Sequence, residues 1–141
     1  MMQAFEWYVP ADHAHWRRLA TALPTLKSIG VDNVWVPPGC KASSPQGNGY
    51  DIYDLYDLGE FDQKGGVGTK WGTKAELMAL ISKAEEVGIG VYWDAVLNHK
   101  AAADRKVKCM AVEVDPNGRV APGVSRSRSS KSLRLRDTQI E

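Results

Sequence analysis

Residues 1–99 alternate between short apolar or aromatic runs and longer runs with helical spacing, and this alternation restricts the fold more than any other feature. Strands are expected at residues 3–9, 31–36 and 89–93, with helices between them. Alternating strands and helices favour a parallel sheet with right-handed crossovers. The sequence therefore predicts an α/β fold, in which ligands bind where the parallel strands end.

Local signals mark the ends of the two helices. Asp12 is a candidate N-cap of the first helix, which Pro24 is expected to kink or restart and Gly30 to end. Residues 73–76 form the capping-box pattern T-x-x-E of the second helix, and Gly88 supplies its stop. The expected buried face of the second helix consists of Leu77, Leu80, Ile81, Ala84 and Val87. The third strand, which follows, is apolar enough to be buried on both faces.

The connection over residues 37–72 is rich in Gly, Asp and Tyr, and connections of this length are often functional. Its segment 49–61 interleaves tyrosines with aspartates, which suits a sugar-binding surface. It equally suits a structured loop whose tyrosines pack and whose aspartates cap turns. Residues 65–70 carry glycines and a lysine without the spacing of a phosphate-binding loop, so we expect a flexible turn there.

Three polar residues, Asp94, Asn98 and His99, follow the third strand closely. Asp and Asn oxygens suit a hard cation such as calcium, and an imidazole can bond to a hydroxyl group. In the alternative interpretation, Asp94 caps the next turn and the other two are ordinary loop residues. The spacing alone leaves both interpretations open.

The composition excludes several classes of protein. The 141 residues suit one soluble domain, and no apolar run approaches the roughly 20 residues that span a bilayer, so no membrane partner is expected. The start of the chain lacks the basic and apolar segments of a signal peptide, which favours a cytoplasmic protein. Cys40 and Cys109 are too few for a disulfide framework or a zinc cluster. His13 and His15 are expected to be exposed, and the five tryptophans are more often core, although Trp7 and Trp35, near strand ends, could instead contact a ligand.

The C-terminal segment 119–141 differs from the rest of the chain. It carries a net charge of +4, whereas residues 1–118 carry −3. Residues 125–136 contain five serines and five cations and cannot build a core, so a disordered tail is expected. Alternating Arg and Ser also suits binding to nucleic acid, but aromatic residues are not interleaved, so nucleic acid is not the partner we favour.

Four segments together resemble the start of an α-amylase of glycoside hydrolase family 13. They read MMQAFEWYVP, GVDNVWVPP, GYDIYDLYDLGEFDQKGGVGTKWGTKAEL and VYWDAVLNHK. The last contains DAVLNH, which matches the family pattern D-x-V-x-N-H at every fixed position. The resemblance covers residues 1 to about 118, and it is closest to the liquefying bacterial enzymes and their intracellular fungal relatives.

The resemblance implies a (β/α)₈ TIM barrel, of which this chain would supply the first three β-strands and two α-helices. Residues 1–99 would form the N-terminal part of that catalytic barrel, and residues 100–118 the start of a small domain inserted after strand three. Residues 119–141 are unrelated to the family. Such an incomplete barrel exposes an edge, so we expect marginal stability and aggregation unless a partner supplies the missing part.

By resemblance, Tyr50 would stack on the sugar before the scissile bond, and His99 would hydrogen-bond a hydroxyl of that sugar. Asp94 would support the same subsite. Asn98 resembles a ligand of calcium, the cofactor that the family implies.

The resemblance implies hydrolysis of internal α-1,4-glucosidic bonds in starch-like glucans with retention of configuration. That chemistry needs two carboxylates about 5–5.5 Å apart. In the family, the nucleophile and the acid/base follow later strands, and none of the carboxylates in this chain matches them, so the chain alone is expected to be inactive. The alternative is a non-catalytic glucan-binding fragment that keeps Tyr50, Trp7 and His99 as a half-site.

Overall fold

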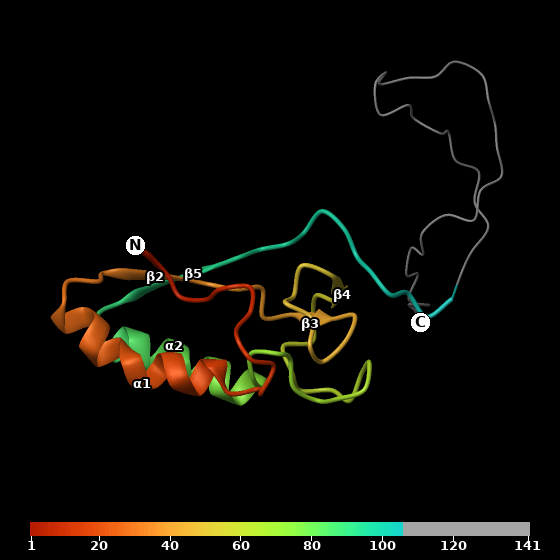
Figure 1. Ribbon diagram of the computed structural model, residues 1–141, viewed down its shortest axis with the longest axis horizontal. Coiled ribbons are helices and arrows are strands. Elements are labelled where there is room, and N and C mark those ends of the chain that lie inside the picture. Colours follow the sequence, from red (N-terminus) through yellow and green to blue (C-terminus); the bar gives the residue numbers. More distant parts are fainter. Residues whose placement is uncertain (106–141) are drawn as a thin grey trace, which may run out of the picture.

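A parallel three-stranded sheet carries one layer of helices. The computed structural model describes residues 1–105. Strands β1 (Met2–Gln3), β2 (Asn33–Val36) and β5 (Gly90–Trp93) pair in the order β1-β2-β5, all parallel. Helices α1 (His15–Ser28) and α2 (Lys74–Val87) lie side by side against one face of this sheet (Figure 1). The predicted α/β class and the order of the main strands and helices are confirmed, but the strand expected at residues 3–9 is wrong in its bounds, because β1 ends at Gln3.

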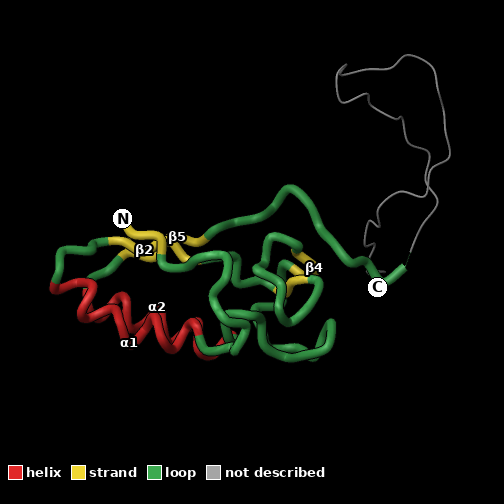
Figure 2. The backbone as a smooth tube through the Cα atoms, viewed as in Figure 1, coloured by secondary structure: helices red, strands yellow, loops and turns green. Residues whose placement is uncertain are grey.

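The long connection contains a small antiparallel pair, β3 (Lys41–Ala42) and β4 (Ile52–Asp54). It lies beyond the carboxyl end of β2, and the remaining residues of the connection wind around it as loops and turns (Figure 2). The connection therefore builds its own small structural unit at the end of the sheet where ligands are expected.

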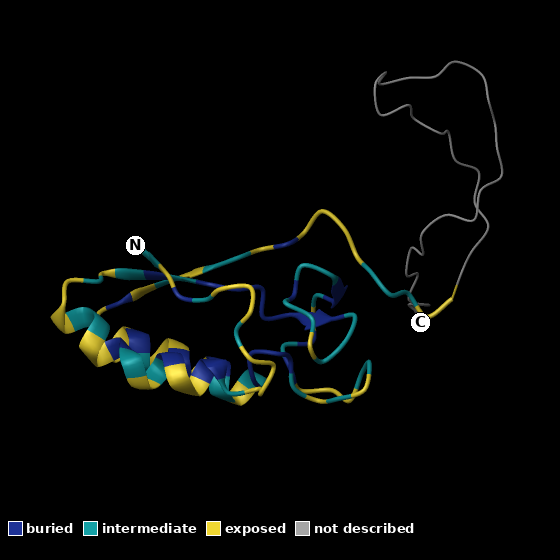
Figure 3. Ribbon diagram, in the orientation of Figure 1, coloured by how far each residue is buried: buried dark blue, intermediate teal, exposed yellow. Residues whose placement is uncertain are grey.

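The core lies between the sheet and the two helices (Figure 3). Strand β2 is the central strand, and it buries alternate residues while Asn33 and Trp35 are only partly covered. Each helix contributes one apolar stripe at helical spacing. The central members of this core are Trp16, Leu19, Leu23, Val34, Val36, Trp71, Leu77, Leu80 and Ala84.

Helix α1 differs from its expected form in the middle and at its start. It continues without interruption from His15 to Ser28 with Pro24 inside it, so the expected restart is wrong, while the kink stays a prediction. Its N-cap is Ala14 without a side-chain cap, while an Asp12 carboxylate oxygen accepts a hydrogen bond from the Ala14 N–H at 3.2 Å. The tertiary packing of α1 against the sheet and α2 overrides the local signals.

Helix α2 confirms both of its predicted ends. The Thr73 side chain accepts a hydrogen bond from the Glu76 N–H, and the Glu76 carboxylate accepts one from the Thr73 N–H at 2.8 Å. Gly88 ends the helix in the left-handed region, with φ of 72°. Ile81, expected on the buried face, is instead 37% exposed, because it lines an open apolar pocket between α2 and β5.

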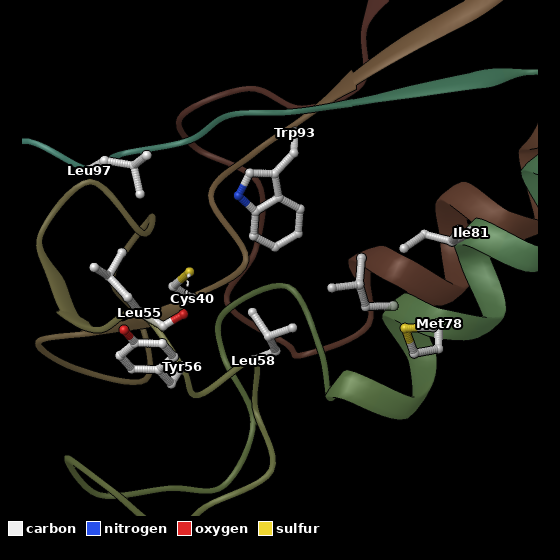
Figure 4. A pocket seen from close by; sticks show the side chains of 9 residues that line it. Cys40, Leu55, Tyr56, Leu58, Met78, Ile81, Trp93 and Leu97 are labelled. Atoms are coloured by element: carbon white, nitrogen blue, oxygen red, sulfur yellow. Dashed lines mark hydrogen bonds between the residues drawn. The ribbon is translucent and has the colours of Figure 1, made fainter.

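Strand β5 is not buried on both faces as expected, and Tyr92 is largely exposed. The strand pairs with β2 only and forms an edge of the described sheet. Beside it, side chains from β5, α2 and the long connection line an apolar pocket of about 540 Å³ (Figure 4). This pocket is bounded by Cys40, Leu55, Tyr56, Leu58, Leu77, Met78, Ile81, Trp93 and Leu97.

The predicted tail 119–141 and most of segment 100–118 lie outside the described residues, so both assignments stay predictions. In residues 1–105, neither helix is long and apolar enough to cross a membrane.

Candidate functional site

Asp94 and Tyr50 meet at the carboxyl end of the sheet, although 44 residues separate them in the sequence. Asp94 follows β5, and its N–H donates to the Val36 carbonyl at 3.2 Å, which fixes its main chain beside the end of β2. The Tyr50 hydroxyl donates to an Asp94 carboxylate oxygen at 2.7 Å. Burial, followed by this hydrogen bond and the charge of Asp94, raises the pKa of Tyr50 well above its ordinary value. The phenol is therefore a neutral donor.

His99 joins the same cluster from the loop after β5. Its Nε2 atom lies 2.6 Å from the Tyr50 carbonyl oxygen. Because a carbonyl oxygen only accepts, Nε2 carries the proton, and a neutral ring leaves Nδ1 as an acceptor. A neutral His99 held in this way accepts from a hydroxyl group, and it donates through Nδ1 only when it is protonated. The side chain is exposed and accessible to a ligand.

Trp7 extends the cluster with a second aromatic ring. The rings of Trp7 and Tyr50 stack with their centroids 5.7 Å apart and their planes inclined by 15°. Trp7 is 58% exposed, so a large part of its surface stays open to solvent. The structure places Trp7 at this site and not in the core.

Gly49 explains how Tyr50 reaches Asp94. Its φ is +94°, a conformation that L side chains rarely adopt. A Cβ atom at this position would lie 2.3 Å from the Pro38 carbonyl oxygen. Only glycine lets the loop pass this close to the end of β2, which brings the next residue over the end of the sheet.

Asn98, the predicted calcium ligand, has an exposed side chain in the loop after β5. Calcium takes about 6–8 oxygen ligands. Within residues 1–105, no group of three or more His, Cys, Asp or Glu side chains is placed to hold a metal ion. The role of Asn98 as a calcium ligand stays a prediction.

Segment 49–61 contains residues that fit each of its two interpretations. Asp57 is fully buried, and one of its oxygens accepts from the Gly59 and Glu60 N–H groups at 2.8 and 3.0 Å. Asp54 is also buried, and it accepts from the Tyr56 N–H at 3.1 Å. These carboxylates cap turns, as the structural interpretation predicts, whereas Tyr50 belongs to the site.

Two lysines that were not predicted as site residues hold the loops next to the site. Lys41 is buried, and its ammonium donates to the carbonyls of Phe61, at 3.0 Å, Gly66, at 2.9 Å, and Val67. Lys70 is buried as well, although Val67 of the same segment is 46% exposed, and the flexibility expected of residues 65–70 stays a prediction. His15, expected to be exposed, is also buried. No local sequence pattern predicts the burial of these residues, because lysine is mostly found at the surface and histidine is intermediate between surface and core.

Comparisons with known proteins identify a family and several relatives. The family described as the alpha amylase catalytic domain matches residues 11–113. Glucan 1,4-alpha-maltohexaosidase of Bacillus sp. (strain 707) is 52% identical over 119 residues, which are 84% of this chain and 23% of that protein. Alpha-amylase of Bacillus licheniformis is 50% identical with the same coverage. A cytoplasmic alpha-amylase of Escherichia coli (strain K12) is 43% identical over 84% of this chain and 24% of its own length.

Solved structures show the same fold. A truncated alternansucrase of Leuconostoc mesenteroides has a TM-score of 0.69 at 23% identity, covering 85% of this chain and 12% of its own. A trehalose-6-phosphate hydrolase of Bacillus licheniformis has a TM-score of 0.52 at 28% identity, covering 71% of this chain and 17% of its own. The chain spans about a quarter of the length of its curated relatives. The family match, the sequence identity and the shared fold show that the chain belongs to the alpha-amylase catalytic-domain family.

Proposed function

We propose that this chain supplies part of the glucan-binding cleft of an α-amylase that hydrolyses internal α-1,4-glucosidic bonds in starch-like glucans. The observation that carries the proposal is the cluster of Tyr50, Asp94 and His99, which the structure brings together at the carboxyl end of a parallel sheet. These are the residues that the resemblance assigns to substrate binding.

The cluster suits a sugar ring in its chemistry. Aromatic faces such as those of Tyr50 and Trp7 present apolar surface to the C–H face of a pyranose ring. One oxygen of Asp94 is bonded to Tyr50, and the carboxylate keeps further lone pairs that can accept from sugar hydroxyl groups. His99, with Nε2 bonded to the Tyr50 carbonyl, directs its other nitrogen to a hydroxyl group.

Hydrolysis requires groups beyond this cluster. Retaining glycosidases need a nucleophilic carboxylate and an acid/base carboxylate about 5–5.5 Å apart. Asp94 is engaged by Tyr50, and its proposed role is to orient the sugar. We propose that the nucleophile and the acid/base belong to other parts of a complete amylase barrel. The 141-residue chain alone is then expected to bind glucan without hydrolysing it.

Calcium and the cellular location remain proposals. Asn98 would supply one oxygen to a calcium ion whose other ligands lie outside the described residues, and the ion would order the loop after β5. No step of sugar binding depends on it here. The proposed location is the cytoplasm.

Titration of the 141-residue chain with maltohexaose, followed by calorimetry, tests the proposed binding site. Tyr50→Ala removes the stacking ring and the hydroxyl bonded to Asp94, so the dissociation constant should rise at least tenfold. Tyr56→Ala is the matched control, because Tyr56 belongs to the same loop, is 80% exposed and lines the apolar pocket beside Trp93. Equal affinity of the two variants, or no binding by the unmodified chain, contradicts the proposal.

Incubation with soluble starch tests whether the chain is inactive. Reducing ends should form no faster than in a blank reaction, with or without added calcium. Release above the blank that Tyr50→Ala abolishes would show that the chain itself hydrolyses glucan. Binding without any release supports the glucan-binding fragment as the role of this chain.

A further inference from the structure

The main chain at Trp7 is held by two side chains from distant parts of the sequence. The Lys70 ammonium donates to the Trp7 carbonyl oxygen at 3.1 Å, and the Asn48 side-chain amide donates to the same oxygen at 3.3 Å. Lys70 also donates to the Asn48 side-chain oxygen. Each of the three residues is therefore hydrogen-bonded to the other two.

Lys70 is buried beside the Trp7 main chain, although lysine is rarely buried without an ionised partner. It is only 5% exposed, and a buried ammonium loses its hydration and must be compensated by the protein. The positive charge of the other buried lysine, Lys41, is compensated in part by the carboxylate of Asp57, one oxygen of which lies 3.4 Å from the ammonium. The salt bridges within residues 1–105 do not include Lys70, whose partners are two neutral oxygens and the face of the Trp71 ring at 4.9 Å. The ammonium thus fixes the Trp7 main chain without forming an ion pair.

We propose that Lys70 is a positioning residue for the glucan-binding surface. By holding the Trp7 carbonyl with Asn48, it keeps the Trp7 ring stacked on Tyr50 and extends the aromatic surface beyond one sugar unit. This inference rests on the proposed function. It adds that longer glucans, which cover both rings, depend on Lys70 more than short ones do.

Fluorine NMR of the chain labelled with 5-fluorotryptophan tests the positioning directly. The chain has five tryptophans, and Trp7→Phe identifies the Trp7 signal by its loss. Tyr50→Ala gives the position of that signal without the stacked ring. In Lys70→Met, which keeps an unbranched side chain but removes the ammonium, the Trp7 signal should move at least halfway to this position. A Trp7 signal that stays at the unmodified position overturns the proposal.

Three further variants separate positioning from general stability. Lys70→Arg keeps donors and charge, so it should restore most of the original Trp7 signal. Asn48→Ala removes one of the two donors and keeps the ammonium, so it should shift the same signal by a smaller amount. If Lys70→Met loses its signal dispersion and is therefore unfolded, Asn48→Ala decides whether these hydrogen bonds position the Trp7 ring. Lys83→Met, at a lysine on α2 far from Trp7 in the sequence, should leave the Trp7 signal unchanged. An unchanged signal in folded Asn48→Ala also counts against the proposal.

Binding provides the functional readout. The dissociation constant for maltohexaose should rise at least threefold in Lys70→Met, whereas that for maltose should change less than twofold. Equal losses for both sugars would contradict the dependence on chain length. If the unmodified chain binds neither sugar, the proposed function fails, while the Trp7 signal still decides whether Lys70 positions the ring.

Discussion

The Lys41 ammonium shows how one buried charge can organise a loop. It is surrounded by three main-chain carbonyls from residues 61–67 and by the buried carboxylate of Asp57. Burial alone would raise the pKa of Asp57, but hydrogen bonds from Glu60, Gly59 and Phe61, together with the charge of Lys41, outweigh it and lower the pKa. Asp57 is therefore ionised in the folded chain, and its buried carboxylate depends on the nearby Lys41 side chain.

Replacing Lys41 by methionine should destabilise the chain by about 3–5 kcal/mol, because it leaves Asp57 buried without its cation and three carbonyls without their donor. Urea unfolding followed by circular dichroism measures this loss. Lys83→Met is the control, since Lys83 forms only a partly exposed pair with Glu86 at 2.6 Å and should change stability by less than about 1 kcal/mol. Similar losses for the two variants would show that the loop does not depend on the Lys41 ammonium.

His15 should make stability fall in mildly acidic solution. Its burial, and next the positive charge of Arg18, lower its pKa, whereas the Ala4 carbonyl and Asp12 act in the opposite direction. Because the folded pKa lies below the unfolded value of about 6.5, the unfolded chain binds the proton more readily. The stability is complete above pH about 6.5 and decreases as the pH falls from there through the folded pKa.

Urea midpoints at pH 7.5 and 5.5 check this dependence. The unmodified chain should be less stable at pH 5.5, and His15→Phe should remove most of the difference. His13→Gln, two residues away at an exposed position, should retain it. A midpoint that is the same at both pH values in the unmodified chain would contradict the prediction.

Of the single residues that matter for the site or for stability, only some could be predicted from the sequence. Tyr50, Asp94 and His99 could be named in advance because they belong to a family pattern or to the end of an apolar strand. The burial of Lys41, Lys70 and His15 could not be anticipated, because it depends on loops that approach them from 20 to 60 positions away. Such long-range approach leaves no local pattern.

The two helices differ in how much of their structure is local. Both ends of α2 are determined by side chains within a few positions, a capping box and a left-handed glycine, so its boundaries could be predicted. Helix α1 has no side-chain cap and contains Pro24, so its continuity comes from packing. The apolar composition of β5 suggested that both of its faces are buried. Composition does not show what covers each face, and in the structure Tyr92 is exposed.

Pro24→Ala should stabilise α1. The proline lacks the N–H that would bond to the carbonyl four positions earlier, at Ala20, and it is exposed, so the change removes little packing. The gain should be about 2 kcal/mol after allowing for the greater freedom of the unfolded chain. Urea unfolding of the variant measures it, with the exposed Thr21→Ala as a control without the missing N–H. A lower midpoint for Pro24→Ala would mean that the proline ring itself contributes to packing.

Considered as a whole, the described chain leaves apolar surface uncovered along β5 and α2. Tyr92, Met78 and Leu97 are all more than half exposed, and Met78 and Leu97 line the apolar pocket beside Trp93. A sheet edge next to apolar side chains is a surface on which other chains can pair and pack. The 141-residue chain is therefore expected to associate with itself unless further protein covers this side.

Ile81→Glu should reduce that association. It places a charge at the rim of the apolar pocket, where Ile81 is already partly exposed, so the cost to folding is small. Sedimentation velocity over a range of concentrations should show fewer oligomers than for the unmodified chain. Ala79→Glu adds the same charge at another exposed position of α2 and should have less effect. A monomeric unmodified chain that melts cooperatively would contradict the expectation.

The position of β2 between its two partners also determines when the sheet can form during synthesis. β2 pairs with β1, which precedes it, but its longer pairing, from Asn33 to Val36, is with β5. The ribosome makes that partner roughly 60 residues later, which at about 5–20 residues per second is a delay of roughly 3–12 s. During this interval one edge of the central strand has no partner, and the nascent chain is then most open to chaperones and to wrong pairing.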